Sequence, residues 1–223
     1  MSSSGSSGGF WPGEPGDDTE NDNADADVGV TEPDPESVGW QLPESDGETE
    51  TAAGRAHRPG EIDVPAGVAV IEGSPFGSGR SVGIVVARFN SEISNGLLES
   101  ALEALAAASV DQARITVMPV PGAFELPIAA MALAKTRRYS AVIGLGCVIR
   151  GETAHFDYVA TEAASGLQLA GLETGVPVAF GVLTVDTLEQ AQARIGKGGE
   201  AARAALEMAD IFSQVRALAR AAR

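Results

Sequence analysis

Four apolar segments of strand length alternate with amphipathic helical segments from residue 81 onward, and this alternation restricts the fold more than any other feature of the chain. Continuous apolar runs are typical of strands buried on both faces, and they predict strands at 81–87, 114–120, 141–145 and 176–183. Repeated strand–helix units imply a parallel sheet with right-handed crossovers and helices on both faces. The sequence therefore predicts an α/β fold, a three-layer sandwich around a four-stranded parallel sheet.

Five helices are predicted between and after these strands. In the first, at 93–105, apolar side chains recur with the 3.6-residue period of one helical face, and Ser94 or Asn95 is expected to cap the N-terminus. A shorter apolar run at 68–71 predicts an additional strand ahead of the sheet. The other helices are expected at 124–138, 156–173, 187–195 and 199–219.

Residues 1–61 differ in composition from the rest of the chain. They contain 15 acidic and 2 basic residues, whereas residues 62–223 contain 16 acidic and 13 basic residues. Their apolar side chains are too sparse to offset the entropy of ordering, so we interpret 1–61 as a disordered acidic leader and 62–223 as the folded domain. The leader could keep an assembly soluble. Its few large apolar residues could anchor a partner or could be isolated in a solvated tail; these are Phe10, Trp11, Trp40 and Leu42.

The charge balance and the single cysteine restrict partners and compartment. A net charge of −16 argues against nucleic-acid binding, which needs a clustered basic surface. Cys147 alone cannot form an internal disulfide, which favours a reducing compartment. The N-terminus lacks the basic and apolar regions of a signal peptide, and no segment approaches the ~20 apolar residues that cross a bilayer. We therefore expect a cytoplasmic protein without nucleic-acid or membrane partners.

Ligands of open parallel sheets bind off the carboxyl ends of the strands, so the segments that follow the strands form the candidate site. In the third of them, Gly151, Glu152 and Thr153 stand between a strand and a helix start. Backbone N–H groups and a hydroxyl there could seat a phosphate, although the same features fit an ordinary loop that caps its helix. The four segments are 88–90, 121–125 and 146–155, which follow the first three strands, and 180–184, which puts Phe180 toward the end of the fourth strand.

Several side chains at this edge could take part in binding or chemistry. His155, the only histidine of the predicted domain, could transfer protons or could cap its helix. Phe89, Phe124 and Phe180 could clamp a planar ring or could pack in the core. Glu125 could accept hydrogen bonds from a ligand or could interact with the dipole of the helix that follows.

No metal or cofactor site is expected. One cysteine and one domain histidine cannot supply the usual zinc or iron ligands, and the carboxylates are scattered. The glycine patterns of dinucleotide and P-loop sites are absent. Cys147 is flanked by apolar strand residues, so it is expected to be buried and inert. The residues together predict a cofactor-free site for a flat ring beside a small phosphorylated molecule, with one imidazole for proton transfer.

Five colinear motifs resemble the 6,7-dimethyl-8-ribityllumazine synthase family. They are ARFNSEIS (87–94), VPGAFELP (120–127), GCVIRGETAHFDYV (146–159), VPVAFGVLT (176–184) and the Arg194 region with a terminal ALEMAD (205–210). The resemblance covers residues 68–216 and implies a flavodoxin-like fold. It also implies a transferase of riboflavin biosynthesis, which condenses 5-amino-6-(D-ribitylamino)uracil with 3,4-dihydroxy-2-butanone 4-phosphate and releases phosphate and water.

The resemblance implies roles for the substrate-binding residues. Phe89 would stack on the pyrimidine ring, and Gly151, Glu152 and Thr153 would bind the phosphate through the helix N-terminus. The remaining residues would line the ring and ribityl pocket: Asn90, Ala123, Phe124, Glu125, Val148 and Ile149.

It also implies the catalytic groups. His155 would shuttle protons during imine formation and phosphate elimination, and Glu200 would orient it. Phe180 and Arg194 would reach the cleft from a neighbouring subunit, with Arg194 forming a charge-assisted contact to the phosphate.

The resemblance further implies homopentamers, which in this family often pack into an icosahedral shell, with the strand at 68–71 adding to a neighbouring subunit's sheet. The connection between Arg194 and Glu200 is short, so the position of Lys197 and the choice between pentamer and shell stay open. Two other functions also stay open. One is a non-catalytic shell or scaffold protein whose acidic leader recruits a partner or cargo, and the other is a flavodoxin-like module that binds a flavin without turnover.

Overall fold

The computed structural model describes residues 62–222, and strands and helices alternate along this part of the chain. The strands are β1 (Val82–Ala87), β2 (Ile115–Val120), β3 (Ala141–Ile149) and β4 (Val178–Val185). The helices are α1 (Ser91–Ala107), α2 (Leu126–Lys135), α3 (His155–Thr174), α4 (Leu188–Gln192) and α5 (Lys197–Ala221), with 3-10 turns η2 (Gln112–Arg114) and η3 (Ala123–Glu125). Within the described range, no helix is both long and apolar enough to cross a membrane.

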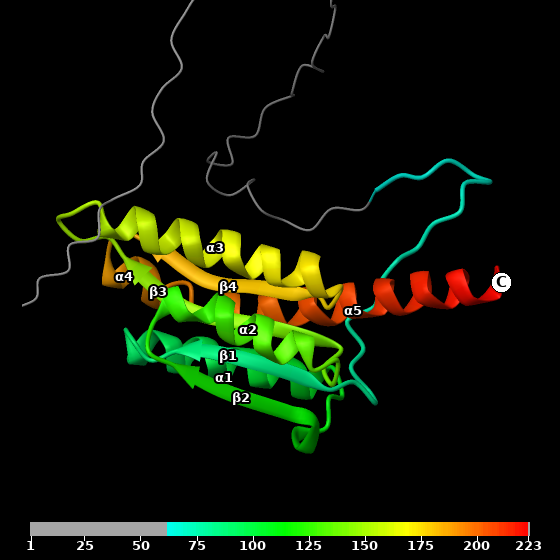
Figure 1. Ribbon diagram of the computed structural model, residues 1–223, viewed down its shortest axis with the longest axis horizontal. Helices are drawn as coiled ribbons and strands as arrows, with labels where there is room; N and C mark the ends of the chain where they lie inside the picture. Colours follow the sequence, from blue (N-terminus) through cyan, green and yellow to red (C-terminus); the bar gives the residue numbers. More distant parts are fainter. Residues whose placement is uncertain (1–61, 223) are drawn as a thin grey trace, which may run out of the picture. The chain divides into compact units, whose positions relative to one another are not determined.

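All four strands pair in parallel, in the order β2-β1-β3-β4. Strand β1 lies inside the sheet, where Val82 is opposite both Ile115 of β2 and Ala141 of β3. Because the strands are parallel, their carboxyl ends lie along one edge of the sheet (Figure 1). The predicted α/β fold with a four-stranded parallel sheet is confirmed.

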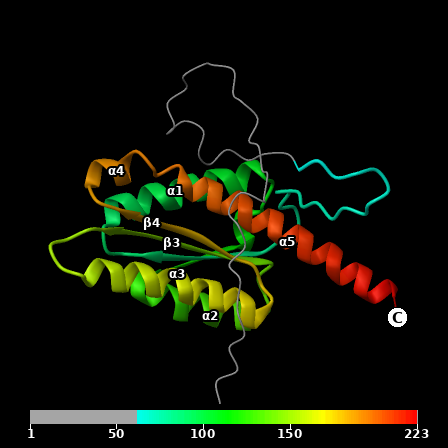
Figure 2. The ribbon, with the colours of Figure 1, turned by 90° about the horizontal axis from the view of Figure 1, so that it is seen from above.

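Helices cover both faces of the sheet. Figure 2 shows α1, α4 and α5 on one side of the strands and α2 and α3 on the other. Successive residues of β1 point to opposite faces, as the two-residue period of a strand requires. Ile84 therefore belongs to the core shared with α1 and α5, and Val85 belongs to the core shared with α2 and α3. The result is the three-layer, flavodoxin-like sandwich that the sequence predicts.

The carboxyl ends of β3 and β4 lie further along the chain than predicted. Strand β3 continues to Ile149 instead of ending at Leu145, because its last residues pair with β4 as far as Val185. The prediction that Phe180 lies toward the end of its strand is therefore wrong. Phe180 is the third residue of β4, opposite Gly144, near the amino end of that strand.

Helix α1 begins earlier than predicted. Asn90 adopts the left-handed conformation, with φ 56°, and immediately precedes the first helical residue, Ser91. Asparagine tolerates this conformation better than most residues. Ser94 and Asn95, the predicted caps, lie inside the helix, and Ser94 is buried with its hydroxyl 3.4 Å from the carbonyl oxygen of Phe89.

The segment ahead of β1 is held along α5 by polar contacts. The Ser74 N–H donates to Asp210, Gln214 donates to the carbonyl oxygen of Glu72, and Arg80 forms an ion pair with Asp210 at 2.6 Å. Hydrogen bonds from Gln214 and from Ser74, together with the Arg80 charge, lower the pKa of Asp210 below its usual range. These contacts fix the entry of the chain into the sheet.

Residues 68–71, which were predicted to form an extra strand, are exposed and pair with no strand among residues 62–222. Their predicted pairing is with a neighbouring subunit's sheet, so that pairing stays a prediction.

Two glycines let α5 cross α1 closely. A Cβ atom on Gly198 would collide with the carbonyl oxygen of Leu97, and one on Gly199 would lie 3.0 Å from the Ser100 hydroxyl oxygen. Both glycines are buried, and the Gly199 N–H donates to that hydroxyl. The short connection before α5 therefore ends in a close helix–helix contact that larger residues could not make.

Candidate active site

A cleft of about 750 Å³ opens at the carboxyl edge of the sheet. Three predicted segments contribute to it: the loop after β1, the turn after β2, and the end of β3 with the start of α3. Ten of the predicted substrate-binding or catalytic residues line it: Phe89, Asn90, Ala123, Phe124, Glu125, Val148, Ile149, Gly151, Thr153 and His155.

The loop after β1 presents an exposed ring to the cleft. Backbone hydrogen bonds from Arg88 to Val120 and from Phe89 to Pro121 extend the pairing of β1 with β2 beyond the strands. The Asn90 amide donates to the carbonyl oxygen of Cys147 at 2.9 Å, which ties the loop to β3. The backbone on both sides of Phe89 is thus anchored, while its side chain is 72% exposed.

The turn after β2 presents a second ring and a carboxylate. Ala123 and Leu126 are buried in the core, whereas Phe124 between them is 56% exposed. The half-buried Glu125 folds back toward Gly122, where an added Cβ would lie 3.2 Å from the Glu125 carboxylate. Two phenyl rings with an acceptor beside them suit a flat ligand that carries hydrogen-bond donors.

The loop between β3 and α3 contributes the third wall. His155 is the first residue of α3 and its side chain is exposed. The backbone N–H of His155 donates to the Thr153 hydroxyl at 3.4 Å. The first turn of a helix carries N–H groups without intrahelical partners, which attract anions. Gly151, Thr153 and His155 line the cleft, whereas Glu152 of the same loop does not.

Some residues of the cleft were not predicted as functional. Tyr158 lies three residues after His155, so the two side chains share one face of α3. Tyr158 is 69% exposed. The helical period counted from His155 would have found it, together with Val159. The lining residues that were given no functional role from the sequence are Pro121, Gly122, Cys147, Phe156, Tyr158 and Val159.

Phe180, Arg194 and Glu200 do not line this cleft within one chain. Arg194 follows α4 and donates to the carbonyl oxygen of Gln190 at 2.9 Å, and Glu200 forms an ion pair with Lys197 at 2.6 Å. None of the contacts of Glu200 in the described part of the chain reaches His155. The roles predicted for Phe180 and Arg194 involve a neighbouring subunit, and all three predicted roles, including that of Glu200, stay predictions.

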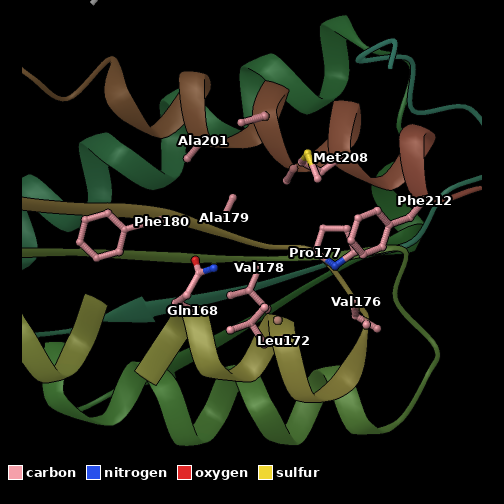
Figure 3. A pocket seen from close by; sticks show the side chains of 14 residues that line it. Gln168, Leu172, Val176, Pro177, Val178, Ala179, Phe180, Ala201, Met208 and Phe212 are labelled. Atoms are coloured by element: carbon pink, nitrogen blue, oxygen red, sulfur yellow. The ribbon is translucent and has the colours of Figure 1, made fainter. Parts of the chain in front are cut away.

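Phe180 instead lines a second, apolar depression of about 440 Å³. Figure 3 shows Phe180 on β4, with Leu172 contributed by α3 and Met208 by α5. All three side chains are substantially exposed, and β4 is an edge strand of the sheet.

Cys147 lies beneath the cleft and is almost completely buried. Burial raises the pKa of its thiol from 9.0 to about 11. The thiol is therefore protonated at neutral pH, which makes it a poor nucleophile. Across residues 62–222, no three His, Cys, Asp or Glu side chains are grouped so as to hold a metal ion.

This chain thus combines an open parallel α/β sheet with a small-molecule cleft at its carboxyl edge, walled by two rings, a carboxylate and a helix N-terminus. These features define the class of flavodoxin-like α/β proteins with a ligand site at the strand ends. Residues 79–213 match the model of the family described as 6,7-dimethyl-8-ribityllumazine synthase. The chain belongs to that family, as its motifs indicated.

Proposed function

We propose that the protein condenses 5-amino-6-(D-ribitylamino)uracil with 3,4-dihydroxy-2-butanone 4-phosphate to 6,7-dimethyl-8-ribityllumazine, releasing phosphate and water. The observation that carries this proposal is the single cleft that gathers Phe89, Phe124, Glu125 and the His155 end of α3. A ring site beside an anion site is what this pair of substrates requires. The proposed catalytic domain is 62–223, acting in the cytoplasm without metal or nucleotide.

In this proposal the pyrimidine stacks on Phe89. Phe124 lies against the ring or the ribityl chain, and Glu125 accepts hydrogen bonds from ring or hydroxyl groups. Asn90, Ala123, Val148 and Ile149 complete the pocket. The two reactants are held in register, which removes most of the entropic barrier to a bimolecular condensation.

The phosphate of the second substrate sits at the N-terminus of α3, near Gly151, Glu152 and Thr153. His155 accepts and returns protons as the amine adds to the ketone, as water leaves the carbinolamine and as phosphate is eliminated. Its exposure at the cleft allows contact with the reacting atoms.

We also propose that the active unit is a homo-oligomer, a pentamer or a shell built from pentamers. Three observations support a neighbouring copy. The edge strand β4 borders an exposed apolar depression, residues 68–71 are exposed and pair with no strand in the described part of the chain, and Phe180, Arg194 and Glu200 lie away from their own cleft. If a neighbouring subunit covers β4, these three side chains would lie at the cleft of that subunit. There Arg194 would bind the phosphate, and Glu200 would orient the His155 that lines the same cleft.

The test of the reaction is absorbance of the lumazine chromophore when the purified full chain meets both substrates without added metal or nucleotide. We expect formation well above the uncatalysed mixture. We expect removal of residues 1–61 to leave turnover intact, because every proposed site residue lies beyond them. A rate equal to the uncatalysed mixture would exclude the enzyme and favour a scaffold or a binding module.

Replacing Arg194 by alanine should raise the apparent KM for the phosphorylated substrate about tenfold, because a charge-assisted hydrogen bond to phosphate is lost. The KM for the pyrimidine should change much less. Steady-state kinetics with each substrate varied in turn gives both values. The matched control is Arg203→Ala, which removes an exposed arginine of α5. Equal effects of Arg194→Ala on both KM values would contradict the role.

A further inference from the structure

Arg150 stands between two cleft residues but does not line the cleft itself. Ile149 before it and Gly151 after it both line the cavity. The Arg150 N–H donates to the carbonyl oxygen of Val185 at 2.9 Å, which extends the pairing of β3 with β4 by one residue. Its backbone is therefore fixed at the point where the phosphate-side loop begins.

The Arg150 side chain bridges two segments that are far apart in the sequence. Nε lies 3.1 Å from a carboxylate oxygen of Asp186, just after β4, and Nη1 lies 3.2 Å from a carboxylate oxygen of Asp157 in the first turn of α3. Its guanidinium carbon lies 4.1 Å from the centre of the Phe156 ring. Two carboxylates and a ring face are a combination that suits the planar guanidinium and not a lysine ammonium.

These contacts enclose the loop that carries the proposed phosphate site. Arg150 precedes residues 151–154, and its partners Phe156 and Asp157 follow them. The loop is exposed and has few hydrogen bonds of its own, from His155 to Thr153 and from Asp157 to Ala154. Its conformation therefore depends on how its two ends are held together.

We propose that Arg150 is a positioning residue, which holds the first turn of α3 against the β4–α4 connection and thereby sets the affinity of the cleft for the phosphorylated substrate. This inference rests on the proposed function for its substrate, and on the contacts of Arg150 for its geometry. Arg150 also neutralises Asp157, whose negative charge would otherwise oppose an anion at the same helix N-terminus.

The ion pairs of Arg150 are exposed, which distinguishes a role in positioning the loop from a role in stabilising the fold. The side chains of Arg150, Asp157 and Asp186 are 46%, 58% and 66% exposed. Ion pairs at this exposure contribute little to the free energy of unfolding, because solvent screens them. Loss of Arg150 is therefore expected to appear in loop order and in substrate affinity, with little change in global stability.

The first test compares Arg150→Met with Arg80→Met in the full chain. Arg80 also forms an ion pair with an aspartate but lies just before β1, at the opposite end of the sheet. Hydrogen exchange followed by mass spectrometry should show faster exchange of residues 151–159 in Arg150→Met and unchanged exchange there in Arg80→Met. Unchanged exchange in Arg150→Met would overturn the proposal. Because no substrate is used, this result is independent of whether the chain makes the lumazine.

The second test measures kinetics and competition by inorganic phosphate. We expect Arg150→Met to raise the KM for the phosphorylated substrate and the inhibition constant of phosphate about tenfold, with the pyrimidine KM changed less than about twofold, because the misplaced loop binds the phosphate and not the pyrimidine. Arg150→Lys should recover only part of the loss. Equal rises in both KM values, or full recovery by lysine, would overturn the proposal.

A double variant tests whether Arg150 acts through Asp186. Asp186→Asn alone should raise the phosphate inhibition constant, whereas adding it to Arg150→Met should change that constant by less than about twofold, since the contact is already lost. Independent, multiplying effects would overturn the bridging role. Absence of lumazine formation by the wild-type chain, with the exchange result intact, would refute the proposed reaction and leave the positioning of the loop standing.

Discussion

Replacing Gly198 by alanine is expected to lower the free energy of unfolding by about 3 kcal/mol. The added methyl group would collide with the carbonyl oxygen of Leu97 and lie 2.8 Å from its carbonyl carbon. Both are backbone atoms of α1, so no change of side-chain rotamer relieves the overlap and α5 must shift. Urea-induced unfolding at a fixed protomer concentration measures the loss, because association also contributes to apparent stability.

Gly196→Ala is the matched control for this prediction. Gly196 lies two residues earlier, immediately before α5, has a helical backbone conformation, and has nothing within 4 Å of an added Cβ. Alanine there should leave the free energy of unfolding unchanged or slightly higher, because it restricts the unfolded chain. If the two variants were equally stable, the close crossing of α1 and α5 would not be a constraint on this sequence.

Replacing His155 by glutamine is expected to lower kcat about 10²-fold, at the low end of the range for general acid–base catalysis. Glutamine keeps the ability to hydrogen-bond but cannot accept and return a proton. The low end is expected because His155 is exposed, so that water can replace part of its function. Single-turnover formation of the lumazine, with both substrates saturating, isolates the chemical steps from binding.

The matched control is His57→Gln, which removes the other histidine of the chain. It should leave kcat unchanged, because residue 57 lies outside the proposed catalytic domain. A kcat for His155→Gln within about twofold of the wild type would show that proton transfer by this side chain is not needed, and that positioning of the substrates accounts for the rate.

Local sequence patterns predict which residues lie in buried strands and which lie at the cleft. Buried strands read as continuous apolar runs, and the carboxyl ends of parallel strands must share one edge. For this reason local patterns suffice to assign Phe89, Phe124 and His155 to one site, although they are far apart in the chain. The cleft confirms that they lie together.

The placement of residues that depends on pairing across the sheet was harder to predict from the sequence. The end of β3 is set by its register with β4, where Ile149 faces Val185, and this shift moves Phe180 away from the strand end. Tyr158 was missed because only the loop before its helix, up to His155, was included in the predicted site. No local pattern gives the register of β3 with β4, since strand register is not a local property, whereas the helical period counted from His155 does indicate Tyr158.

The sequence by itself determined the layered α/β architecture and the segments at the strand ends, because apolar periodicity and βα connectivity are properties of neighbouring residues, and its five motifs indicated the family. Only the tertiary structure decided that Arg150 joins Asp157 to Asp186 and that Gly198 admits the crossing of α1 and α5. Such contacts join segments that are separated by tens of residues, and they depend on where each backbone lies once the whole sheet has formed.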